Sequence, residues 1–161
     1  MERLLRATLP DGRFSNVPKV RSLAMAAVKG KHNRTTEVQF RMALVRAGVK
    51  GWVTHSALRG KPDVYFPKAR IAVFLDGCFW HGCSRCGHIP KTNNLFWTTK
   101  IGRTQARDRK TSRQLRKEGV HVIRAWEHTL NNPTQLEKVL GRIQAILRKP
   151  RSIKHETHET E

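Results

Sequence analysis

The sequence predicts a single domain of mixed α/β (α+β) class, with a central mixed β-sheet flanked by helices. Segments with apolar residues at helical spacing alternate with short runs rich in Val, Ile, Phe and Tyr, a pattern typical of helices packed on a sheet. The length of 161 residues suits one ordinary domain and is too short for two full enzyme domains. We assign this domain to residues 19–150, between a flexible basic N-terminal arm (1–18) and a disordered polar tail (151–161).

The first half of the domain is predicted to contain two helices and three strands. Apolar residues recur at helical spacing in 19–28 and 36–47, and Gly48 ends the second of these helices. Three short runs that favour β-structure follow, separated by turn-forming LRGKP and PKA segments, at 51–55, 62–66 and 70–75.

The second half begins with a segment that has no period of its own. Residues 78–90 hold three cysteines and two histidines, a composition that needs a cross-link such as a metal ion to become ordered. A long, very basic helix is then predicted over 95–117 and a further strand over 121–126. The last helix, over 133–147, carries one apolar stripe that faces the core.

The charge of the chain points to a polyanionic partner. There are 32 Lys and Arg against 12 Asp and Glu, a formal net charge of +20, and contacts of such residues with phosphates release counterions. Charge alone does not decide between binding and cutting a nucleic acid. No run is apolar enough to span a membrane and the first residues lack a signal core, so we expect a cytoplasmic protein associated with DNA, with reduced thiols.

Four acids lie next to apolar runs and are therefore informative in this acid-poor chain: Glu37, Asp63, Asp76 and Glu127. Asp63 and Asp76 flank predicted strands, and Glu37 faces inward by its helical phase. Acids that converge from a helix and two strands form an oxygen site that Mg²⁺ accepts, which implies metal-assisted phosphodiester hydrolysis. Ordinary roles are the alternatives: turns at Asp63 and Asp76, and an ion pair of Glu37 with Arg41.

The three cysteines, Cys78, Cys83 and Cys86, follow a C-x4-C-x2-C pattern, and the C-x2-C half lets two thiolates bind one tetrahedral ion. The candidates for a fourth ligand are His81, His88 and His128. Three thiolates and one imidazole make a closed, structural zinc site. The alternative, three reduced cysteines in a core, is disfavoured because this Gly- and Arg-containing loop offers no core.

His81 and three aromatic residues complete the set of candidates. His81 lies close to Asp76 in sequence and is either a metal ligand or an imidazole that moves protons near neutral pH. Phe79, Trp80 and Trp97 lie in polar surroundings, so they are candidates to stack on or wedge between DNA bases. The alternative for these rings is to seal the cysteine segment against the sheet.

Several motifs then occur in a recognisable order: GKPD (60–63), FLDGCFWHGC (74–83), PKTN (90–93), FW (96–97), KI (100–101) and WE (126–127). In these motifs the chain closely resembles the very short patch repair (Vsr) DNA mismatch endonucleases. The resemblance extends from about Arg21 to the last helix, roughly four-fifths of the chain.

The resemblance implies a restriction-endonuclease-like fold and an enzyme that nicks one strand beside a T:G mismatch. It also implies Mg²⁺ as catalytic cofactor, Zn²⁺ as structural cofactor, and a role in the repair of deaminated 5-methylcytosine. The partner would be double-stranded DNA with a T:G mismatch, with mismatch-repair proteins as further partners. We expect a monomer, because a single mismatch has no two-fold symmetry.

Residue roles carry over by motif. Asp63 matches the metal-binding aspartate, the main-chain carbonyl of Leu75 matches a second metal contact, and His81 matches the histidine that activates the attacking water. Glu37 and Asp108 match acids near the active site, whereas Asp76 occupies a variable position. The aromatics that wedge into the duplex are matched by Phe79, Trp80 and Trp97.

The resemblance also assigns zinc ligands, which are Cys78, Cys83, Cys86 and His128. His128 stands where the family can have cysteine, and a cysteine loop about one residue longer leaves His88 as a competing ligand. The wider nuclease superfamily has a lysine where this chain has Cys78, so His81 must act as the base.

Two other functions remain open at this point. The first is a related restriction or nicking endonuclease without mismatch preference, which would share the same acids. The second is a non-catalytic, zinc-stabilised DNA-binding module, which would leave Glu37, Asp63 and His81 without a role.

Overall fold

The computed structural model describes residues 34–149, and the predicted arm, the helix at 19–28 and the tail lie outside them. The first helix begins with a π-helical turn, η1 (Arg34–Val38), and continues as α3 (Gln39–Arg46). The remaining elements are β1 (Val64–Phe66), β2 (Ile71–Asp76), α4 (Asn94–Lys117), β3 (His121–Trp126), α5 (Glu127–Leu130) and α6 (Pro133–Arg148). None of the helices in this part of the chain is both long and apolar enough to cross a membrane.

The three strands form one mixed sheet in the order β1-β2-β3. β1 and β2 are antiparallel, with Val64 opposite Val73. β2 and β3 are parallel and pair over their whole lengths, from Ile71 opposite His121 to Asp76 opposite Trp126. The long connection through α4 allows the parallel pairing. A mixed sheet flanked by helices, as predicted, is confirmed.

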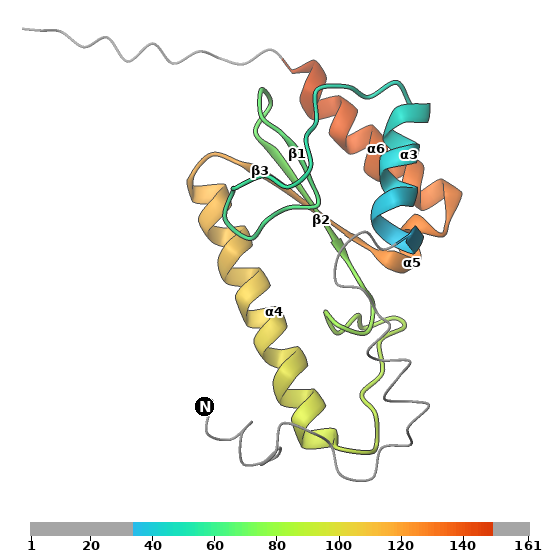
Figure 1. Cartoon of the computed structure of the whole chain (residues 1–161), viewed down its shortest axis with the longest axis vertical. Coiled ribbons are helices and arrows are strands. Elements are labelled where there is room, and N and C mark those ends of the chain that lie inside the picture. Colours follow the sequence, from blue (N-terminus) through green and yellow to red (C-terminus); the bar gives the residue numbers. More distant parts are fainter. Residues whose placement is uncertain (1–33, 150–161) are drawn as a thin grey trace, which may run out of the picture.

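The helices cover both faces of the sheet (Figure 1). On one face, α3, α5 and α6 contribute to the larger core, which consists of Phe40, Leu44, Val49, Val64, Phe66, Ile71, Val73, Ile123, Ala125, Leu130, Val139 and Ile143. On the other face, Leu115 of α4 packs in a smaller cluster with Ala72, Phe74, Val120 and Val122. Successive residues of a strand point to opposite faces, so the even-numbered residues of β2 and β3 face α4.

One predicted strand is wrong, and several predicted boundaries differ by one or two residues. Residues 51–55 form only an isolated bridge, Val53 with Tyr65, because Gly51 and His55 have φ angles of 82° and 55° that an extended strand cannot contain. β1 begins at Val64 and not at residue 62, since Pro62 has no N–H for a ladder. The short helix α5 was not predicted, because a four-residue helix has no periodic pattern.

Candidate active site

The alternation of side chains carries polar groups to one end of the sheet, on the face that α4 covers. In β2, Ala72 and Phe74 pack against the α4 side, so Asp76 emerges on the same face. In β3, Val122 packs on this face and Arg124, opposite Phe74 in the register, follows it. Tyr65 of β1 also packs there, and the same alternation places Asp63 on this face. The sheet therefore presents two acids and an arginine to α4.

Asp63 is held at the start of β1 by the neighbouring strand. Its N–H donates to the Val73 carbonyl at 3.0 Å, and its Oδ2 accepts a hydrogen bond from the Leu75 N–H at 2.7 Å. In a strand, the N–H and C=O of one residue point to the same edge, so the Leu75 carbonyl also faces Asp63. Burial raises the pKa of Asp63 above its ordinary value, and the nearby Glu37 and Asp76 raise it further, against the lowering effect of the Leu75 hydrogen bond.

Glu37 lies in η1, where its helical phase turns it partly inward as predicted. Its carboxylate is 3.9 Å from Nη2 of Arg41, and its carbonyl accepts a hydrogen bond from the Arg41 Nε at 3.2 Å. The ion pair with Arg41 is thus present, but it is long and leaves Glu37 in the same cleft as Asp63.

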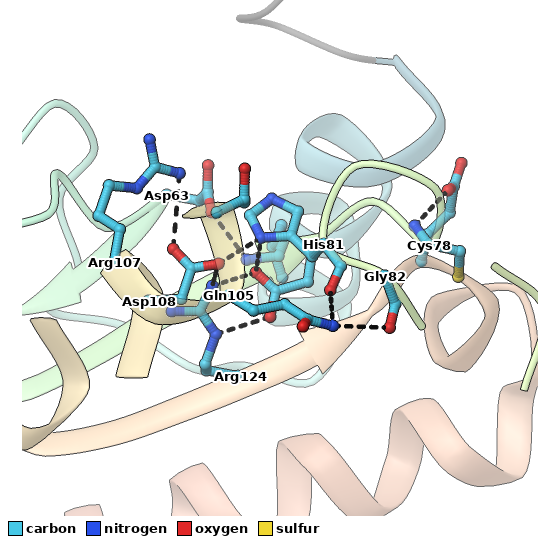
Figure 2. A network of polar contacts seen from close by, with 12 residues as sticks. Asp63, Cys78, His81, Gly82, Gln105, Arg107, Asp108 and Arg124 are labelled. Atoms are coloured by element: carbon cyan, nitrogen blue, oxygen red, sulfur yellow. Dashed lines mark hydrogen bonds and ion pairs between the residues drawn. The ribbon is translucent and has the colours of Figure 1, made fainter. Parts of the chain in front are cut away.

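His81 is oriented by two acids (Figure 2). Its Nδ1 lies 2.6 Å from Oδ2 of Asp108 on α4 and 3.5 Å from Oδ1 of Asp76. An Nδ1–H that donates to a carboxylate leaves the Nε2 lone pair available to accept a proton. An imidazole held in this way can accept a proton at Nε2.

A single cleft of about 750 Å³ is lined by Glu37, Asp63, Asp76, Asp108, His81 and Leu75. Trp80 and the cations Lys61, Lys100 and Arg107 line it as well. The sequence analysis did not single out Arg124, which also lines this cleft. The one signal that could have indicated it is a lone basic residue within the otherwise apolar part of the strand HVIRAW.

Gln105 of α4 supports the His81 turn and was also missed. Its Nε2 donates to the carbonyls of His81 and Gly82 at 3.2 and 3.1 Å. Gly82 has φ +65°, and a Cβ there would lie 2.5 Å from Cγ2 of Ile101. A larger residue at Gly82 would therefore displace both α4 and the His81 turn.

The three cysteines and His128 come together beside this cleft. Nδ1 of His128 lies 3.2, 3.6 and 3.3 Å from the sulfurs of Cys78, Cys83 and Cys86, and the sulfurs of Cys83 and Cys86 are 3.6 Å apart. A tetrahedral zinc ion would place its sulfur and nitrogen ligands about 3.6 Å apart and two sulfurs about 3.8 Å apart. The donor set therefore fits a tetrahedral metal. His88 lies instead against Phe79, with ring centroids 6.0 Å apart.

The electrostatics of the cluster also favour a cation. Interaction with the Cys78 thiol chiefly raises the pKa of Cys86, to about 12. Burial opposes ionisation of Cys83, but backbone hydrogen bonds from Cys86 and Arg85 outweigh it and lower the pKa of Cys83. Glu127, one of the four acids that the sequence analysis selected, does not line the cleft; its Oε2 accepts a hydrogen bond from the Cys78 N–H at 3.2 Å.

The predicted wedge residues form one aromatic cluster. The ring of Phe79 lies 5.0 Å from that of Trp80 and 5.2 Å from that of Trp97 in edge-on contacts. The Lys100 ammonium lies 5.4 Å from the Trp80 ring. Trp97 belongs to α4, is 9% exposed and contacts Phe79 of the cysteine segment, whereas the alternative expected these rings to seal that segment against the sheet. The structure thus brings the three rings together, with Trp80 lining the cleft.

The comparisons with known proteins agree with this geometry. Residues 16–86 match the family model of DNA mismatch endonuclease Vsr. The chain is 46% identical over 68 residues to Type II nicking enzyme V.NaeI from Lentzea aerocolonigenes, a match to 42% of this chain and 41% of that protein.

Two further relatives match over greater lengths. Type II nicking enzyme V.NmeAIP from Neisseria meningitidis is 37% identical over 76% of this chain and 88% of its own length. DNA mismatch endonuclease Vsr from Escherichia coli is 34% identical over 64% of this chain and 68% of its own length. This chain therefore belongs to the Vsr family of DNA endonucleases.

Proposed function

We propose that this endonuclease uses Mg²⁺ to nick one strand of duplex DNA beside a T:G mismatch, in the repair of deaminated 5-methylcytosine. The observation that carries the proposal is the meeting of an oxygen-rich metal site, at Asp63 and Leu75, with an oriented imidazole, His81, in one basic cleft. The family model and the name of the Escherichia coli relative support the mismatch as substrate.

The residues around Asp63 fit a hard divalent cation. Asp63 and the Leu75 carbonyl supply oxygen ligands, which Mg²⁺ prefers. Burial chiefly raises the pKa of Asp63, and repulsion from Glu37 and Asp76 raises it further; a bound cation would relieve this repulsion. When bound, Mg²⁺ would supply charge stabilisation of the pentacovalent phosphate and orient the attacking water.

The chain's own side chains then perform the proton transfer and bind the phosphates. Asp108 holds the Nδ1–H of His81, so Nε2 takes the proton from the attacking water. Lys61, Lys100 and Arg107 bind phosphate oxygens around the scissile bond, and thereby hold the DNA strand in the cleft.

We assign Zn²⁺ to Cys78, Cys83, Cys86 and His128. Four protein ligands leave no open position, so this ion would be structural and would take no part in the hydrolysis. Its role is to fix the turn that carries Phe79, Trp80 and His81, which lies between the first two cysteine ligands.

Phe79, Trp80 and Trp97 would wedge into the duplex beside the mismatch. Unstacking a base step requires a few kcal/mol, and a mismatched step needs less than a paired one. That difference would give mismatch selectivity, whereas phosphate contacts would give affinity.

The mixed sheet flanked by helices supports a restriction-endonuclease-like fold. We expect a monomer that works on chromosomal DNA, with mismatch-repair proteins as further partners.

A second candidate is a nicking endonuclease that acts on a specific paired sequence. It is favoured by the names of the Lentzea and Neisseria relatives, which describe nicking enzymes and no mismatch. This alternative uses the same cleft and the same metal, and it differs only in how bases are read.

The test compares nicking of end-labelled duplexes with T:G or paired bases across varied flanking sequence, with and without Mg²⁺. Asp63→Ala is expected to bind DNA and to lose nicking, whereas Glu137→Ala, on the exposed face of α6, is the matched control that retains it. A nick that needs both Mg²⁺ and the mismatch supports the proposal. Equal nicking of paired DNA supports the second candidate, and full activity of Asp63→Ala contradicts both.

A further inference from the structure

Arg124 occupies the centre of the charged cluster behind His81 (Figure 2). Its Nε donates to Oδ2 of Asp76 at 2.7 Å, and its Nη2 bonds the other oxygen of Asp76, so the contact is bidentate. The same Nη2 lies 3.2 Å from Oδ2 of Asp108. The guanidinium also lies 5.0 Å from the centre of the Phe74 ring, which supports it from the sheet.

Arg124 is the main counter-charge of this acid pair, which is largely removed from water, although Asp108 also has Nη2 of Arg107 at 3.5 Å from its Oδ1. The side chains of Asp76 and Asp108 are 6% and 17% exposed, and that of Arg124 is 23% exposed. Two carboxylates this close to one imidazole repel each other unless a cation lies between them. Oδ2 of Asp108 contacts both Arg124 and Nδ1 of His81, so the arginine fixes the oxygen that orients the imidazole.

Arg124 also stands where a metal ion would otherwise fit. Ligand atoms of Asp76, His81 and Asp108 lie within 4.8 Å of one another, a grouping that could hold a cation. Arg124, however, already bonds both oxygens of Asp76 and the Asp108 oxygen nearest His81. A divalent ion would have to displace the guanidinium before it could bind these acids.

The surroundings leave space for this exchange. Asp76, His81, Asp108 and Arg124 form a wall between the cleft of about 750 Å³ and a second, open cavity of about 980 Å³. Loss of the arginine side chain would therefore open the acids to water and ions from two sides. Lysine cannot replace it fully, because an ammonium does not reproduce the planar fork that binds a carboxylate through two donors.

We propose that Arg124 is a positioning residue that acts as a built-in counter-cation: it clamps Asp76 and Asp108, holds His81 through Asp108, and keeps a divalent ion out of this acid pair. The positioning role rests on the proposed function, in which His81 is the base. The exclusion of a metal ion from the acid pair rests on the contacts of Arg124 alone.

The test uses the full-length, zinc-loaded protein with Arg124→Gln and Arg124→Lys. The control is Arg142→Gln, which removes the same charge from an exposed position on α6. Single-turnover nicking of Arg124→Gln is expected to fall roughly 10–100-fold with DNA affinity within about two-fold of the control, because outer-sphere partners of a reacting group have effects of this size. The single-turnover rate of Arg124→Lys is expected to lie between those of Arg124→Gln and the control. Low millimolar guanidinium is expected to restore part of the rate of Arg124→Gln.

Metal binding is the second readout. Electron paramagnetic resonance of added Mn²⁺ should count one more bound ion in Arg124→Gln than in the wild type. The double variant Asp76→Asn/Arg124→Gln, which leaves no unpaired carboxylate at position 76, is the control for the Mn²⁺ count and serves for the rate measurement if the single variant does not fold. It is expected to show the same loss of rate but no additional Mn²⁺.

The outcomes separate this inference from the proposed function. Arg124→Gln with the rate of the control, or a loss confined to DNA affinity, overturns the positioning role. An unchanged Mn²⁺ count in a folded Arg124→Gln overturns the counter-cation role. If the wild type nicks no duplex, the proposed function fails, and the Mn²⁺ count still decides whether Arg124 excludes a metal ion.

Discussion

Replacing His128 with alanine tests whether a metal ion holds the cysteine segment together. Nδ1 of His128 contacts the sulfurs of all three cysteines, at 3.2 to 3.6 Å. The substitution therefore removes the one of these four candidate metal ligands that comes from a distant part of the chain. Other hydrogen bonds also link residues 77–90 to the rest of the chain: Cys78 N–H donates to Glu127, Gln105 donates to the carbonyls of His81 and Gly82, and His81 contacts Asp108.

The expected magnitude follows from linkage. An ion that binds only the folded state, at a free concentration about 1,000 times its Kd, stabilises the protein by about 4 kcal/mol. One kcal/mol shifts the Tm of a chain of this size by about 2–4 °C, so removal of the ion should lower the Tm by roughly 8–16 °C.

The assay measures zinc content by atomic emission and the Tm with and without a chelator. Chelation is expected to lower the Tm of the wild type, whereas His128→Ala starts at the low value and does not move further. His88→Ala, in the same segment but packed on Phe79, is the matched control that keeps its zinc and its response to chelator.

The pH dependence has a definite sign. Zinc binds thiolates, and the pKa of Cys86 is about 12 without a metal, so binding must release its proton. The apparent zinc affinity should therefore rise about tenfold or more for each pH unit near neutrality. The reasoning would be refuted if His88→Ala lost its zinc while His128→Ala kept it. It would also be refuted if the chelator left the Tm of the wild type unchanged.

Three other predictions concern the cleft. Asp63→Asn should abolish nicking yet raise the Tm of the metal-free protein at neutral pH. The pKa of Asp63 is higher in the folded state than in the unfolded state, so the folded protein loses stability as the pH rises from the unfolded pKa to the folded pKa. The gain should vanish at low pH, where both states are protonated, and thermal unfolding across pH checks it. Trp80→Ala should lower the ratio of T:G to paired nicking about 2- to 13-fold, because each aromatic contact contributes about 0.5–1.5 kcal/mol; unchanged selectivity argues against the wedge. Gln105→Leu, which removes the hydrogen bonds to the carbonyls of His81 and Gly82, should slow single-turnover nicking without changing zinc content.

The sequence predicted most elements because their patterns are strong and local. β3 lies where the β-rich run of 121–126 was found, and α4 and α6 differ from prediction by one residue at one end. The segment 51–55 shows the limit: its Val and Trp favour a strand, but backbone turns at Gly51 and His55 prevent one.

The candidate site was predicted in part, because acids beside apolar runs are visible in a sequence whereas their partners are not. Glu37, Asp63, Asp76, His81 and Asp108 were all named and all line the cleft. Arg124 was missed because its role depends on the parallel register of β2 with β3, which sets it beside Asp76. The same register and the short helix α5 after β3 bring His128 to the cysteines, a contact that spacing alone left open between three histidines.

The most direct test of the central claim is the ratio of single-turnover nicking rates on two duplexes that differ only in one T:G or C:G pair, measured with Mg²⁺. The account predicts a nick on one strand of the T:G duplex at a much higher rate than on the paired one, and its loss in Asp63→Ala. Equal rates on both duplexes, or a nick that persists in Asp63→Ala, would contradict it.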